Sequence, residues 1–142
     1  MDDARLKHLE FIQQVISRQA GNQFLIKGWS LTVAIALAAL NLKAMDWRVA
    51  LVGLLPPAAF GWLDAYFLRQ ERLFRCLYNA AIATNSAVPL LSMDTRPHKD
   101  EYSSWKSVLK STPLQVLYTG SFLLAIGVVL AAAVHHAPAA SR

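Results

Sequence analysis

Two ionisable side chains, Lys27 and Asp64, stand inside otherwise apolar stretches of the sequence, residues 24–42 and 49–68. An ionisable group in lipid is costly and usually faces a charged partner or water. Lys27 precedes the polar turn near residue 45 by 18 residues, and Asp64 follows it by 19. In two antiparallel helices these side chains would lie at the same depth, so we expect an ion pair. The pair would fix helix packing or belong to an ion path or gate; alternatively, Asp64 reaches interfacial water.

The second apolar stretch also contains a proline pair, Pro56 and Pro57. Proline has no amide hydrogen, so the pair must kink or break a helix and free carbonyls that need cover. Small residues recur in two of the apolar stretches and predict close helix approach, within one subunit or between subunits. The positions expected to pack in this way are Gly53, Gly61, Ala65, Gly127 and Ala131.

No other group of residues has the spacing of a catalytic, cofactor or metal site. His98 lies in a loop with Asp94 and Asp100, without the regular spacing of metal ligands, and Cys76 is a lone cysteine. Nucleophile-elbow, phosphate-loop and zinc-protease motifs do not occur. We therefore expect neither an enzyme nor a cofactor, and a small membrane enzyme ranks behind the two functions given below.

The composition of the chain favours a membrane protein. The chain is 55% hydrophobic and 16% charged, whereas soluble domains average about 25% charged residues. Three stretches approach the length of about 20 apolar residues that spans a bilayer. They are residues 24–42, 49–68 and 114–134. The fold expected is an all-α integral membrane protein of one domain.

Two further segments have a helical period. Residues 1–23 form an amphipathic helix with apolar side chains three and four apart, and Gly21-Asn22 is a weak stop or bend after it. The second span continues without a breaker into a long cytoplasmic helix, followed by a loop and a short interfacial helix at 103–110, all within residues 69–113. Residues 135–142 form an outer tail.

The basic residues predict the orientation. Eleven of the fourteen lysines and arginines lie in the N-terminal segment or between the second and third spans. Basic residues concentrate on the cytoplasmic side, so the N-terminus is expected inside and the C-terminus outside the bacterial inner membrane. Topology thus accounts for the net charge of +5, and nucleic-acid binding is not expected.

Two segments carry a resemblance, HLEFIQQVISRQAGNQFLIKGWS and WLDAYFLRQERLFRCLYNAAI. Their layout resembles small bacterial inner-membrane proteins and the SLATT class of membrane effectors in phage defence. The resemblance covers residues 8–83, and the third span departs from that two-span pattern. It implies a protein that oligomerises and breaches the inner membrane when a partner signals infection.

Two functions follow as expectations. The first is a homo-oligomeric membrane effector or channel, larger than a dimer, in contact with membrane lipids and activated by a soluble cytoplasmic sensor or by its own cytoplasmic helices. The second is a non-conducting anchor or accessory subunit whose cytoplasmic helices dock a soluble partner.

Overall fold

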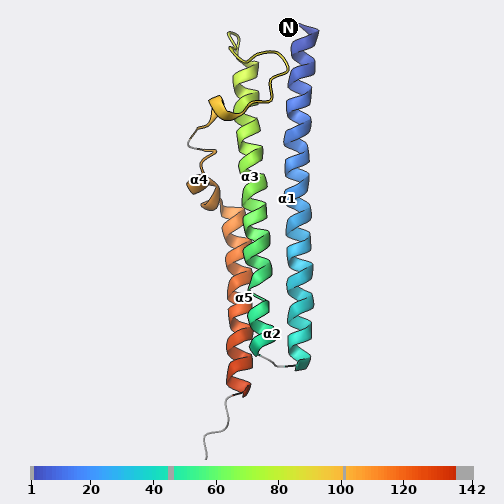
Figure 1. The fold of residues 1–142 in the computed structure, drawn as a ribbon, viewed down its shortest axis with the longest axis vertical. Coiled ribbons are helices and arrows are strands. Elements are labelled where there is room, and N and C mark those ends of the chain that lie inside the picture. Colours follow the sequence, from blue (N-terminus) through green and yellow to red (C-terminus); the bar gives the residue numbers. More distant parts are fainter. Residues whose placement is uncertain (1, 45–46, 101, 137–142) are drawn as a thin grey trace, which may run out of the picture. The chain divides into compact units, whose positions relative to one another are not determined.

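The computed structural model describes residues 2–44, 47–100 and 102–136. Its elements are α1 (Asp3–Ala44), α2 (Trp47–Val52), α3 (Leu55–Ile82), the short 3₁₀ helix η1 (Arg96–His98), α4 (Trp105–Leu109) and α5 (Thr112–His136). Within these ranges every regular element is a helix (Figure 1), so the all-α prediction is confirmed. The chain divides into two units, Met1–Leu25 with Ala65–Ser111, and Ile26–Asp64 with Thr112–Arg142.

Among the described residues, three stretches are helical, long and apolar enough to cross a membrane: Asp3–Leu40, Ala50–Ile82 and Thr112–Val134. Many of their large apolar side chains point outward. Phe24 is 79% exposed, Val116 69% and Val134 76%. Large apolar side chains are mostly buried in soluble proteins, whereas lipid would cover exposed ones such as these. The three apolar helices therefore agree with the three predicted spans.

In the first unit, the apolar stripe of α1 packs against α3. Leu9, Ile12 and Ile16 are buried with Leu77 and Ala81 in a core that also holds Val88 and the neighbouring side chains of Phe74, Tyr78 and Ala80. The helical period predicted for both segments is confirmed. Both stripes find cover within one chain, so they give no support for contacts between subunits.

The N-terminal turn of α1 also holds the loop that follows α3. The Arg5 guanidinium donates to the carbonyls of Ala81 at 2.8 Å and Val88 at 3.0 Å. Ala81 lies in the last turn of α3, where carbonyls lack helical partners and cationic side chains are favoured. His8 is fully buried, with its Nε2 2.8 Å from the Ser92 carbonyl.

The break expected at Gly21-Asn22 is wrong, because α1 continues through both residues. A glycine inside a helix costs only about 0.5–1 kcal/mol relative to alanine. Two residues later, Gln23 is buried and donates to the Glu71 carboxylate at 2.5 Å. That contact and the core described above outweigh the weak helix propensity of the pair.

In the second unit, the predicted break at the prolines is confirmed. The helix α2 ends at Val52, and α3 begins at Leu55 with Pro56 and Pro57 in its first turn. Amides in a first turn have no helical acceptor, so proline loses little there. The amide of Gly53 donates to Ala50 at 3.0 Å, and that of Leu54 to Leu51 at 3.1 Å. The tight turn therefore provides hydrogen-bond donors for two carbonyl groups at the end of α2, those of Ala50 and Leu51.

The remaining boundaries agree closely with the sequence. The helix α4 matches the short helix expected at 103–110, and α5 contains the third span. In the turn between the first two spans, residues 45–46 lie outside the described residues, as do residues 137–142 of the outer tail.

Candidate functional site

The predicted ion pair is present in the second unit. The Lys27 ammonium on α1 lies 2.7 Å from Oδ1 of Asp64 on α3. The Asp64 side chain is 1% exposed, whereas that of Lys27 is 31% exposed. A carboxylate buried this far needs a charged partner and further hydrogen bonds to offset its lost hydration. Lys27 supplies the charge, and its flexible stem reaches the surface of the unit.

The third span contributes a residue that sequence reasoning missed. Tyr118 on α5 is 5% exposed, and its hydroxyl interacts electrostatically with Asp64. Among the described residues, neither that hydroxyl nor Oδ2 of Asp64 has a hydrogen bond of standard geometry. The Tyr118 hydroxyl is therefore a neighbour of the Asp64 carboxylate in addition to Lys27, and the three side chains come from three apolar helices.

Gly61 positions Tyr118 by lacking a side chain. A Cβ at Gly61 would stand 3.2 Å from two atoms of the Tyr118 ring. The ring thus occupies the space beside α3 one turn before Asp64. Sequence analysis identified Gly61 as a packing residue, but it did not identify the aromatic partner.

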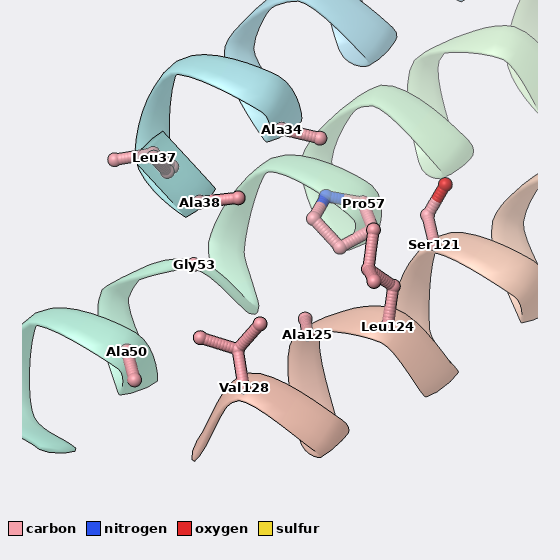
Figure 2. Close-up of a pocket in the computed structure, with 10 residues that line it drawn as sticks. All are labelled: Ala34, Leu37, Ala38, Ala50, Gly53, Pro57, Ser121, Leu124, Ala125 and Val128. Atoms are coloured by element: carbon pink, nitrogen blue, oxygen red, sulfur yellow. The ribbon is translucent and has the colours of Figure 1, made fainter. Parts of the chain in front are cut away.

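A small cavity lies at the helix break, between α1, α2, α3 and α5 of the second unit (Figure 2). Its volume is about 30 Å³. Its lining is mostly apolar: Ala34, Leu37, Ala38, Ala50, Gly53, Pro57, Ser121, Leu124, Ala125 and Val128. The Ser121 hydroxyl donates to the Leu117 carbonyl in its own helix at 2.8 Å. A void of this size holds one or two waters at most.

The expected packing residues have different surroundings. Gly53 borders the cavity, Gly61 meets Tyr118, and Ala65 is fully buried in the first unit. Gly127 and Ala131 are exposed on α5, and a Cβ at Gly127 would meet nothing within 4 Å. The chain itself does not cover these last two positions, so contact between subunits stays a prediction for them.

The first unit holds a second buried polar network, which the sequence did not reveal. The Glu71 carboxylate accepts from Gln23 and from Arg75, whose Nη2 lies 2.7 Å away. Arg72 is 6% exposed and donates to the Tyr102 carbonyl at 2.9 Å and the Ser107 hydroxyl at 3.0 Å. The partners of Arg72 lie at least 30 positions away, so spacing along α3 gave no signal for them.

The acidic loop residues have local partners. Asp94 binds Arg96 through two hydrogen bonds of 2.9 Å, and this guanidinium lowers the pKa of Asp94 to about 2. The amide of Ser103 donates to Asp100 at 2.8 Å and lowers the pKa of that carboxyl. Within the described residues, His, Cys, Asp and Glu side chains form no group of three that could hold a metal ion.

Comparison with known proteins adds no relative. No family model matches the chain, and neither a curated protein nor a solved structure matches it. The resemblance of residues 8–83 to SLATT-type effectors therefore stays a prediction from the sequence.

Proposed function

We propose that the protein is a homo-oligomeric effector of the bacterial inner membrane, channel-like when assembled, of the kind used in phage defence. The observation that carries the proposal is the Lys27–Asp64 pair, with its carboxylate buried inside apolar helices. Such a pair stabilises one arrangement of helices and exposes charge when it opens. In this proposal the intact ion pair is the resting state. When the pair separates, Asp64 faces an ion path that lies between the subunits.

More than one copy is required for conduction. The cavity at the helix break has a volume of about 30 Å³ and an apolar lining, so it offers no hydrated route. Several copies placed around an axis would supply that route, and head-to-tail contacts close into a ring. The exposed Gly127 and Ala131 on α5 suit close approach of a neighbouring helix. We therefore propose an assembly larger than a dimer, with the N-terminus in the cytoplasm.

Membrane potential tests the proposal directly. The wild-type protein is induced in bacterial cells with a potential-sensitive dye, beside Asp64→Asn and Lys27→Met, at matched levels in the membrane fraction. Depolarisation by the wild type is expected. Each single variant leaves one charged side chain without its partner and should change the rate of depolarisation. The double variant Lys27→Met/Asp64→Leu removes both charges and so leaves neither unpaired. Unchanged potential at all expression levels, for every variant, contradicts the effector proposal.

The alternative is a non-conducting anchor whose first unit docks a soluble partner. One observation favours it: exposed apolar side chains gather on that unit. Phe11 is 42% exposed and Met93 38%, and both line a shallow groove with Val15. Harmless expression, together with a soluble protein that co-purifies with the wild type but not with Phe11→Ser/Met93→Ser, would favour the anchor.

A further inference from the structure

The short helix α4 stands where the chain passes from the first unit into an apolar helix. Only Lys110 and Ser111 separate Leu109, its last residue, from Thr112, the first residue of α5. Three Cα–Cα steps of about 3.8 Å give a separation of at most about 11 Å. If α5 spans the membrane, α4 lies at the level of the lipid headgroups.

Two arginines of α3 hold α4 in a fixed orientation. Arg72 donates to the Ser107 hydroxyl, and its guanidinium lies 4.2 Å from the centre of the Tyr102 ring. Arg69 lies over the Trp105 ring at 5.0 Å. The Ser104 hydroxyl caps the helix by accepting from the Ser107 amide at 3.2 Å. These contacts set which face of so short a helix points inward.

The outward face is both basic and apolar. Val108 is fully buried, whereas Leu109 is 48% exposed. Lys106 lies in α4 and Lys110 is the residue that caps its C-terminal end, and both are exposed. Neither lysine has an ion pair with a described acidic side chain. Two cations without an ion pair to a described acidic side chain thus accompany an exposed leucine on this short segment.

We propose that this face binds the headgroup of an anionic phospholipid. Lys106 and Lys110 would bind its phosphate, while Leu109 enters the acyl boundary beside it. Anionic lipid attracts lysine side chains that lie near the membrane surface. A free phosphate would gain nothing from Leu109, so the combination favours a lipid. The proposal requires α5 to be in the membrane, but it does not require the protein to conduct.

Native mass spectrometry of the full-length protein, released from nanodiscs of equal phosphatidylglycerol and phosphatidylcholine, tests the site. The wild type should retain phosphatidylglycerol preferentially. Lys106→Gln/Lys110→Gln should lower that preference about 25-fold, since about 1 kcal/mol per lysine is roughly fivefold for each. Lys106→Arg/Lys110→Arg should keep most of it, and Leu109→Ser should weaken retention of the lipid.

The matched control is Lys7→Gln/Lys99→Gln, which removes the same charge from the first unit elsewhere. An equal loss in this control would show general attraction by net charge and overturn the site. Equal retention of the two lipids by the wild type would overturn it as well. Displacement of the lipid by millimolar inorganic phosphate would show a simple anion site instead. This experiment measures lipid retention, whereas the test of the proposed function measures membrane potential. A negative result in one experiment therefore does not decide the other.

Discussion

Gly61 lies directly against the ring of Tyr118, so that a Cβ at Gly61 would stand 3.2 Å from ring atoms. The contact joins α3 to α5 one turn from Asp64. It also changes what a substitution there would test. A bulky residue at Gly61 disturbs the interior of the chain before it reaches any neighbour.

We expect Gly61→Leu to destabilise the protein, because its side chain must displace a buried ring. Overpacking a core typically costs about 1–3 kcal/mol. Thermal unfolding in mild detergent measures the change. Gly127→Leu is the matched control, because a Cβ at Gly127 meets nothing within 4 Å. Equal melting temperatures for Gly61→Leu and the wild type would contradict the contact.

For self-association, we expect Gly127, which is exposed, to be the more sensitive of the same two glycines. If α5 packs against a neighbouring copy, Gly127→Leu should reduce assembly while leaving the unfolding of a single copy unchanged. Native mass spectrometry across several gentle detergents gives the distribution of subunit numbers. Wild-type protein that is monomeric under all of these conditions would contradict both the assembly and the channel-like function.

Lys27 and Asp64 should be energetically coupled. Removing one member of a buried pair costs about 3–5 kcal/mol, and less here because Lys27 is 31% exposed. We expect Asp64→Leu and Lys27→Met each to destabilise, and the double variant to be milder than the sum of the singles. Thermal or chemical unfolding of the four proteins measures this coupling. Strict additivity would show that the two charges do not interact.

The loop pair Asp94–Arg96 makes a prediction about pH. Hydrogen bonding to Arg96 lowers the pKa of Asp94 to about 2, from about 3.9 in an unfolded chain. Its contribution to stability is therefore complete above about pH 4 and is lost as pH falls through about 2. NMR titration of the Asp94 carboxyl measures the value directly. In Arg96→Gln the pKa should return to its ordinary value, and an unchanged pKa would exclude Arg96 as the cause.

Orientation is the last prediction. Because eleven of the fourteen basic residues lie in the N-terminal segment or in residues 69–113, we expect both regions in the cytoplasm. A phosphatase fused to the C-terminus should be active in the periplasm, and a fluorescent protein there should stay dark. The reverse pattern would mean that the chain crosses the membrane an even number of times.

The sequence predicted those contacts that depend on regular geometry. Leu9, Ile12 and Ile16 follow the helical period, so their burial could be anticipated. The Lys27–Asp64 pair followed from the near-equal distance of both residues from one turn. The lack of an amide hydrogen in proline predicted the break before α3. Fewer backbone carbonyls lack a hydrogen bond there than expected, because those of Ala50 and Leu51 accept from the turn.

Other contacts depend on where distant segments pack, and spacing did not reveal them. Tyr118 follows a long connection after Asp64, so no symmetry fixes its depth relative to that carboxylate. The partners of Arg72 lie beyond a loop for the same reason. The helix continues through Gly21 because tertiary contacts that follow it, such as that of Gln23 with Glu71, outweigh the local preference of glycine for a helix end.

The core of the first unit imposes an order of events during synthesis. Leu9, Ile12 and Ile16 are buried by Leu77, Ala81 and Val88, which leave the ribosome roughly 60–80 residues later. At about 5–20 residues per second, that delay lasts roughly 3–16 seconds. For this time the apolar stripe of the nascent helix has no partner from its own chain. A chaperone or the membrane surface must cover it until translation has passed both of the first apolar stretches.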